Sequence, residues 1–201
     1  MRLHIGDSSC KLLIHECQQQ RLAIGVVLSR SQASSHGKTA TYLVGTAGLI
    51  ASVESYPDGG MNVVIRGGER FRIRSINESG SHLVGHTEAV MESELEDSPR
   101  AIALTSRLRE CADQFVISYL QQIDAPREEV HLPEDPVALS FVIANFLRIE
   151  NLAKQLLLET TDTLERIAEL IPILQEHTSE LSEPGYFKLT SDMVSEWVSP
   201  N

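Results

Sequence analysis

Short apolar runs separated by glycine-containing turns dominate the first ninety residues. Residues 22–28 form an apolar run with β-branched side chains, and residues 70–74 alternate strictly between arginine and an apolar residue. A period of two is typical of a β-strand, so we expect Phe71 and Ile73 to face inward and the arginines outward. Asp-Gly-Gly at 58–60 predicts a tight turn, because glycine accepts the positive φ that hairpin turns need. The pattern therefore predicts several short strands.

Only residues 8–20 interrupt this region with helical spacing, carried by Leu12, Leu13 and Glu16. The strands do not alternate regularly with helices, which argues against an open α/β sheet. Many short strands with tight turns favour a small β barrel or strongly twisted sheets.

The periodicity becomes helical after Glu92. Ser98-Pro99 and Asp135-Pro136 each place a capping side chain before a proline, which predicts two helix starts. Further helices are expected around Leu152–Leu157 and after the capping pair Asp162 and Glu165. From the first start, one apolar stripe is expected along Ile102, Leu108, Ala112, Phe115, Tyr119 and Ile123.

These patterns predict an α+β protein in three parts. A small β barrel with one helix is expected over residues 1–92, an antiparallel helical bundle over 97–178, and a C-terminal tail over 179–201. Pro172 lies inside the last helical pattern and is expected to kink it, because its ring frees the carbonyl of residue 168.

The charge is unevenly distributed along the 201 residues, whose net charge is −11. Residues 1–91 hold nine Lys or Arg against seven Asp or Glu, whereas residues 92–181 hold seven against eighteen. An acidic second half repels phosphate, so nucleic acid is not the expected partner of the whole chain. Without an apolar stretch of about 20 residues or a signal-like N-terminus, we expect a cytoplasmic protein away from membranes.

No residue pattern indicates a metal site, a cofactor site or a catalytic centre. His82 and His86 would lie about 13 Å apart on a strand and could not share an ion. Three cysteines make no disulfide framework. No nucleophile-elbow motif is present, and the carboxylates of the second half fit solvated helix faces. We therefore expect no cofactor, no metal and no enzymatic activity.

The arginines Arg66, Arg70, Arg72 and Arg74 are the most prominent charged group. One interpretation is a solvated strand face, or ion pairs with the acidic second half. The other is a protein-binding surface for an acidic or polar partner, since guanidinium groups bind carboxylates through two hydrogen bonds. Phosphate or RNA binding by the same face belongs to this second interpretation.

Several motifs in order resemble the N-terminal substrate-binding domain of Lon-type proteases. In the first half, residues 44–50, 58–60 and 64–73 are similar to its Gly-Thr-x-Ala-like strand, Asp-Gly turn and Arg-Phe-Arg strand. In the second half, residues 135–141 and 154–159 are similar to the entrance of its helical bundle and its Lys-Gln-x-Leu-Leu-Glu helix. The resemblance covers roughly residues 2–176.

This resemblance implies a PUA-like β barrel followed by a helical bundle, without the ATPase and Ser–Lys protease domains. It implies a stand-alone module that binds unfolded protein or peptide segments, as an adaptor or regulator in protein quality control, with a Lon-type protease as a further partner. RNA binding through the barrel, or a small molecule in the groove between barrel and bundle, are the alternatives. The family's usual first strand precedes the segment at which this chain starts, so we expect that strand to be missing or replaced. The sequence leaves the ligand, the oligomeric state and the pathway open.

Overall fold

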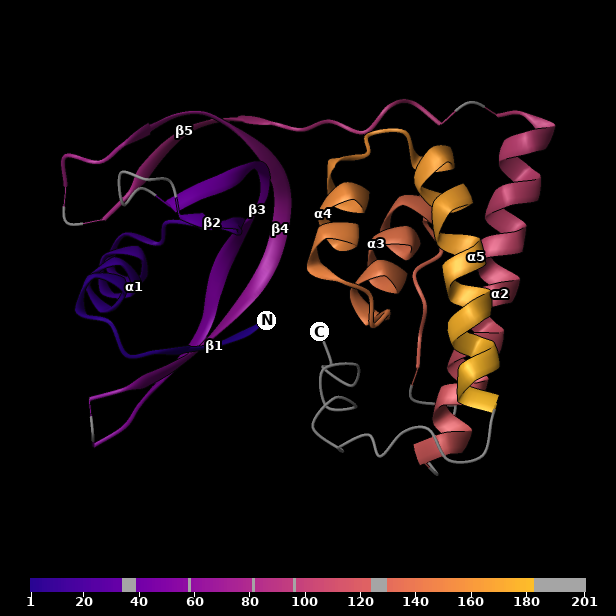
Figure 1. The fold of residues 1–201 in the computed structure, drawn as a ribbon, viewed down its shortest axis with the longest axis horizontal. Helices are drawn as coiled ribbons and strands as arrows, with labels where there is room; N and C mark the ends of the chain where they lie inside the picture. The colour runs from indigo at the N-terminus through magenta and orange to yellow at the C-terminus, as the bar shows by residue number, and fades with distance from the viewer. Residues whose placement is uncertain (34–38, 58, 81, 96, 124–129, 183–201) are drawn as a thin grey trace. The chain divides into compact units, whose positions relative to one another are not determined.

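The computed structural model describes residues 1–33, 39–57, 59–80, 82–95, 97–123 and 130–182. The chain divides into two compact units, Met1–Met91 and Glu92–Asn201, and each is described by itself (Figure 1). Within the described ranges, no helix combines the length and the hydropathy that crossing a membrane requires.

The N-terminal unit is a sheet with one helix. Its elements are β1 (Arg2–Ile5), α1 (Ser8–Gln20), β2 (Ile24–Ala33), β3 (Thr39–Ser55), β4 (Met61–Asn77) and β5 (Val84–Ala89). The predicted helix over residues 8–20 is confirmed, and the Asp7 carboxylate caps it by accepting a hydrogen bond from the Cys10 amide at 3.0 Å. The strand predicted over residues 70–74 is part of the longer strand β4.

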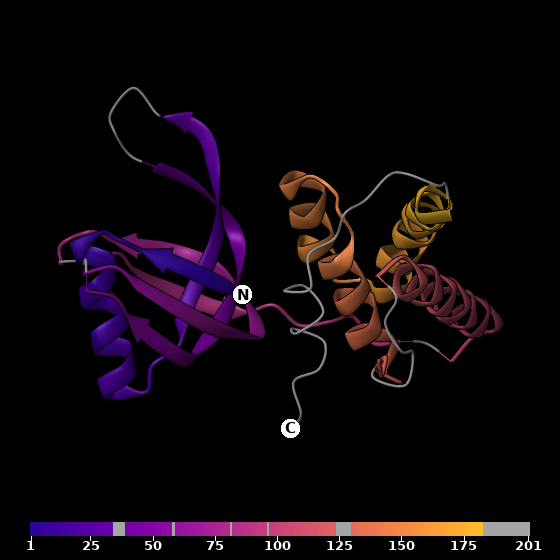
Figure 2. The ribbon, with the colours of Figure 1, turned by 90° about the horizontal axis from the view of Figure 1, so that it is seen from below.

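All strand pairs are antiparallel, in the order β1-β4-β3-β2 (Figure 2). Strand β5 pairs with the second half of β4, whereas β1 pairs with its first half. No pairing recorded among the described residues joins β2 to β1 or β5, so closure of the sheet into a barrel is not confirmed. The expectation rested on the number of short strands, and that number does not determine whether the end strands pair.

Helix α1 covers one face of the sheet. Its Ile14 and Cys17 are buried together with Ile24 of β2 and with Val63 and Ile65 of β4. Burying five apolar side chains of this size contributes on the order of 10 kcal/mol of gross stabilisation. We call this surface of the sheet the helix-covered face.

A bulge in β4 changes which side chains reach the helix-covered face. Arg70 lies opposite Thr46 of β3, and Gly67 lies opposite Gly48. Three steps along β4 therefore match two steps along β3, which is the signature of one extra residue. Because side chains alternate along a strand, one extra residue moves all following side chains to the other face.

The bulge separates the apolar side chains of β4 into two layers. Directly paired residues share a face, so the pairing places Arg70 and Arg72 on the same face as Ile65. Phe71 and Ile73 are both buried, at 9% exposure, but they lie on the opposite face. The prediction that they are buried is confirmed, while the prediction that Arg70 points into solvent is wrong, because the register shift reverses the alternation.

The second unit contains four helices in its described residues. They are α2 (Pro99–Ile123), α3 (Pro136–Phe146), α4 (Asn151–Glu159) and α5 (Thr163–Ser182). Both predicted starts are confirmed: the Ser98 hydroxyl accepts a hydrogen bond from the Ala101 amide at 3.2 Å, and the Asp135 carboxylate accepts one from the Ala138 amide at 2.8 Å.

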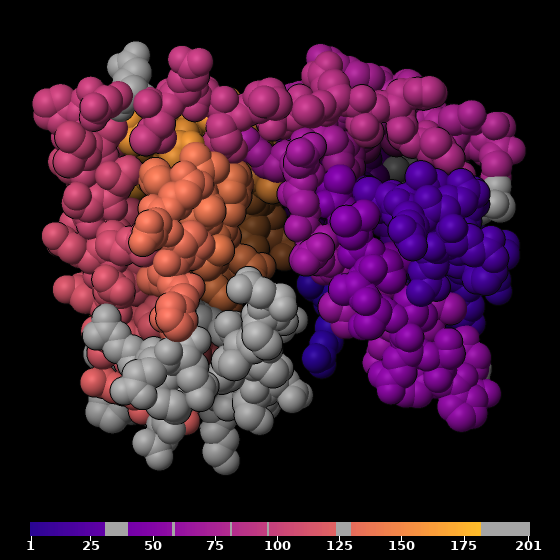
Figure 3. Space-filling view, turned by 180° about the vertical axis from the view of Figure 1, so that it is seen from behind, coloured from indigo at the N-terminus to yellow at the C-terminus, as the bar shows by residue number. Residues whose placement is uncertain are grey.

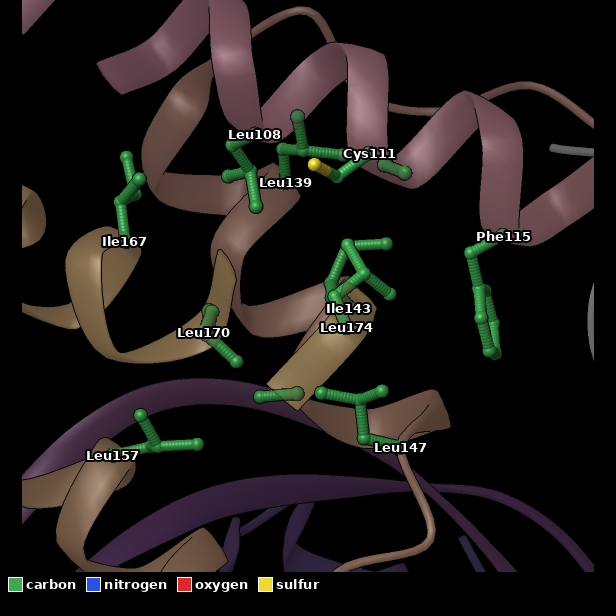
Figure 4. Packing of buried hydrophobic residues seen from close by; sticks show 12 residues of the cluster. Leu108, Cys111, Phe115, Leu139, Ile143, Leu147, Leu157, Ile167, Leu170 and Leu174 are labelled. Carbon is green, nitrogen blue, oxygen red and sulfur yellow. The ribbon is translucent and has the colours of Figure 1, made fainter. Parts of the chain in front are cut away.

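One apolar core joins these helices (Figure 4). Its most deeply buried side chains come from α2, α3, the residue after α3, and α5; they are Leu108, Ile143, Leu147, Ile167, Leu170 and Leu174.

The expected apolar stripe of α2 needs one correction. Ile102 is 59% exposed, so it does not belong to the buried stripe, which Ala101 begins instead. The expected helix around Leu152–Leu157 is confirmed as α4, and of these leucines only Leu157 is buried. Helix α5 contains Pro172 and extends to Ser182; the kink at Pro172 stays a prediction, and the rest of the expected tail lies outside the described residues.

Candidate protein-binding surfaces

The four arginines singled out in the sequence lie in different environments. Arg66 is exposed and lies opposite Leu49, which is 50% exposed. Arg74 is exposed and forms an ion pair with Glu88 on the neighbouring strand β5. Arg72 is partly buried, and only 8% of Arg70 is exposed. The arginines therefore do not form a single outward face, and the bulge in β4 puts Arg70 and Arg72 on the face opposite to Arg66.

Large apolar side chains are exposed on both units. In the N-terminal unit they include Leu12, Leu22, Leu43, Leu49, Leu83 and Val84. In the second unit they include Leu95, Ile102, Leu152 and Leu156. Exposed apolar side chains are typical of protein-binding surfaces where they form a contiguous patch.

A shallow groove of about 400 Å³ lies between the start of α2 and the start of α3, the pink and light-orange segments in Figure 3. Leu95 and Ile102 line it with exposed side chains, and Ala101 and Leu139 are buried at its floor. Arg109, which also lines it, donates hydrogen bonds to the backbone carbonyls of residues 132 and 133. The lining is mostly apolar, which suits an apolar side chain of a partner.

Arg166 is the largest fully buried side chain in the protein's described part. Its guanidinium lies 4.0 Å from the ring centre of Phe141. It donates hydrogen bonds to Ser140 Oγ at 2.9 Å, Thr160 O at 2.7 Å, Thr163 Oγ1 at 3.1 Å and Glu92 Oε2 at 2.9 Å. The Glu92 carboxylate supplies the countercharge that a buried guanidinium requires.

The sequence pattern did not predict this buried pair. One feature of the sequence could have indicated that Arg166 is buried. It shares the spacing of one helix face with residues 163, 167, 170 and 174, which are all buried. An arginine on such a face needs an acidic partner, but sequence alone does not identify one 74 residues away.

The described residues contain no group of three His, Cys, Asp or Glu side chains that could hold a metal ion. His82 instead lies 3.7 Å from the Glu16 carboxylate of α1. Burial lowers the pKa of Lys154, whose Nζ donates a hydrogen bond to the Asn145 carbonyl at 3.0 Å.

The sequence of the chain matches a known family. The family model of the ATP-dependent protease La (LON) substrate-binding domain matches residues 1–176, and the chain belongs to this family.

Relatives of the chain are full-length Lon proteases. It is 27% identical to Lon protease 2 of Syntrophobacter fumaroxidans over 162 residues. This aligned region covers 80% of this chain and 20% of that protein. The chain is 29% identical over 135 residues to Lon protease 1 of Bdellovibrio bacteriovorus, covering 67% of this chain and 17% of that protein. The chain thus spans about a fifth of the length of these relatives.

Solved structures show the same fold. The Lon N-terminal domain protein from Xanthomonas campestris has a TM-score of 0.59 at 17% identity and covers 86% of this chain and 88% of its own. The N-terminal domain of Mycobacterium avium complex Lon protease has a TM-score of 0.59 at 23% identity, with coverage of 88% and 91%. At these identities the similarity establishes the fold alone.

Proposed function

We propose that this chain is a non-enzymatic recognition module that binds unfolded segments of other proteins. The observation that carries the proposal is the family match, which assigns residues 1–176 to a substrate-binding domain. The exposed leucines of both units and the groove beside α2 support it, because binding to unfolded protein depends mainly on apolar contact.

We propose further that the module acts in protein quality control, as an adaptor or a competitor of a Lon-type protease. A domain that binds the same segments as a complete protease either delivers them to it or withholds them from it. Support comes from relatives that are Lon proteases, in which the matched region is about a fifth of the chain.

The direct test is fluorescence anisotropy with a labelled protein kept unfolded by reduction and alkylation. We expect saturable binding to the unfolded form and none to the native form of the same protein. Binding that is equal for both forms, or absent for the unfolded one, contradicts the proposal.

The role beside a protease is tested separately. Degradation of the same unfolded protein by a purified Lon-type protease is measured with increasing amounts of this chain. An adaptor raises the rate and a competitor lowers it. An unchanged rate at saturating chain contradicts both roles while leaving the binding proposal in place.

A further inference from the structure

We infer that the outer edge of β2 is a binding site where an extended polypeptide segment adds a strand to the sheet. The inference rests on the proposed function and deepens it by naming the site, the binding mode and the chemical class of segment.

The topology leaves β2 at the end of the sheet. On one side β2 pairs with β3, and no other strand in the described ranges pairs with its second edge. Backbone N–H and C=O groups on such an edge are ready to pair with an incoming strand. Recognition through the backbone suits a protein that accepts many sequences, because every polypeptide carries the same amide groups.

The other free edges are poorer candidates. Strand β1 has four residues and β5 has six, and a histidine and a glutamate interrupt β5. Strand β2 has ten residues, and Ile24–Val27 run in unbroken register with β3. Natural edge strands are commonly protected by lysine, proline or charged side chains, and residues 24–29 contain none of these.

Both faces of the added strand would meet apolar side chains. On the helix-covered face, Ile24 and Val26 belong to the cluster beneath α1. On the opposite face, the ring of Phe71 packs over Gly25, with its Cζ only 3.0 Å from where a Cβ on Gly25 would stand. An apolar or aromatic side chain facing a strand glycine covers it favourably. The segment should therefore carry apolar residues at successive positions.

The stretch of sequence that contains β2 carries only positive charges. Between Cys17 and Val53 the chain contains Arg21, Arg30 and Lys38 and no acidic residue. Arg21 ends α1 just before β2, and Arg30 lies near the other end of the strand, with its guanidinium 4.6 Å from the ring centre of Tyr42. Charge complementarity thus favours a segment with an apolar centre and acidic residues at its ends.

The test uses a labelled eight-residue peptide with four central apolar residues between glutamates. Two N-methylated versions each block one alternating set of amides. In an added strand, one set of amides points to β2 and the other points away. We expect one methylated peptide to bind at least about tenfold more weakly, because it loses several backbone hydrogen bonds to β2 at once, and the other to bind like the parent. Amide hydrogen exchange at Ile24–Val27 should slow on binding of the parent peptide.

A matched pair of variants tests the charge requirement. Arg30→Glu is expected to lower the affinity for the glutamate-flanked peptide and to raise the affinity for a lysine-flanked one, each by on the order of threefold or more. The control Arg107→Glu changes an exposed arginine of α2 and should alter neither.

The outcomes separate this inference from the proposed function. If the parent and both methylated peptides bind equally, and exchange at Ile24–Val27 is unchanged, the inference is overturned while the proposed function stands. If neither the peptides nor unfolded protein bind, both are overturned.

Discussion

Arg166 donates a hydrogen bond to Glu92 across 2.9 Å, from a side chain with no exposure to one that is 24% exposed. The pair ties the first residue of the second unit to the helix α5. In addition, the Ser93 amide donates to the Thr161 carbonyl at 2.9 Å, so the chain is held where it enters this unit.

The substitution Glu92→Gln should lower the free energy of unfolding by about 3 kcal/mol, because it leaves a buried guanidinium without its countercharge. Urea denaturation measures the loss. The double variant Glu92→Gln with Arg166→Met should be less destabilised than the sum of the single variants. The exposed pair Arg107–Glu110 offers a control, and Glu110→Gln should change stability by less than about 0.5 kcal/mol. Equal losses of stability from the two glutamine substitutions would contradict a stabilising role for the Glu92 countercharge.

Adjacent leucines of α4 should respond very differently to truncation. Leu157 is 3% exposed and belongs to the core, whereas Leu156 is 56% exposed. Leu157→Ala is expected to lower the free energy of unfolding by about 2–5 kcal/mol, because apolar burial is lost and a cavity remains. Leu156→Ala should cost less than about 0.5 kcal/mol. Thermal unfolding of both variants checks this, and a large loss in the second variant would contradict the assigned orientation of α4.

The arginines of β4 should divide into structural and surface residues. Arg70→Ala removes a nearly buried side chain and should destabilise the N-terminal unit by about 1–3 kcal/mol. Arg66→Ala changes an exposed residue and should alter the free energy of unfolding by less than about 0.5 kcal/mol. Denaturant unfolding distinguishes them. Similar stabilities for both variants would mean that the bulge does not turn Arg70 away from solvent.

Thiol labelling should distinguish one cysteine from the other two. Cys10 is exposed, while Cys17 and Cys111 are buried, so native protein should react at a single site. Partial desolvation, with the nearby Asp7 carboxylate, raises the pKa of the Cys10 thiol. A raised pKa lowers the thiolate fraction at pH 8, so the rate with iodoacetamide should be slower than for an unstructured peptide thiol. The rate should also keep increasing above pH 9.

The control for labelling is Cys10→Ser, which should abolish the reaction in native protein. Burial raises the pKa of Cys17, and the Glu16 carboxylate adds to this, so unfolding should be needed before it reacts. Fast modification of two or more thiols in the native protein would contradict the assigned burial.

Local signals made the helix starts predictable from sequence. A capping serine or aspartate followed by proline acts within one turn, and the starts of α2 and α3 follow it directly. The orientation of Arg70 was not predictable in this way, because the bulge is defined by pairing with β3 and not by β4 alone. The acidic partner of Arg166 was likewise hidden, since it lies on a distant segment.

The bulge in β4 determines where this strand can lose a residue. Apolar residues occupy odd positions on both sides of it, as in Val63, Ile65, Phe71 and Ile73, although the two pairs serve different layers. Deleting either Gly67 or Gly68 would remove the extra residue and could leave Arg70 opposite Thr46, so the later side chains would keep their layers. Deleting a residue elsewhere in β4 would move every side chain beyond it into the wrong layer. The sheet should therefore tolerate a one-residue deletion at the bulge better than one at any other point of the strand.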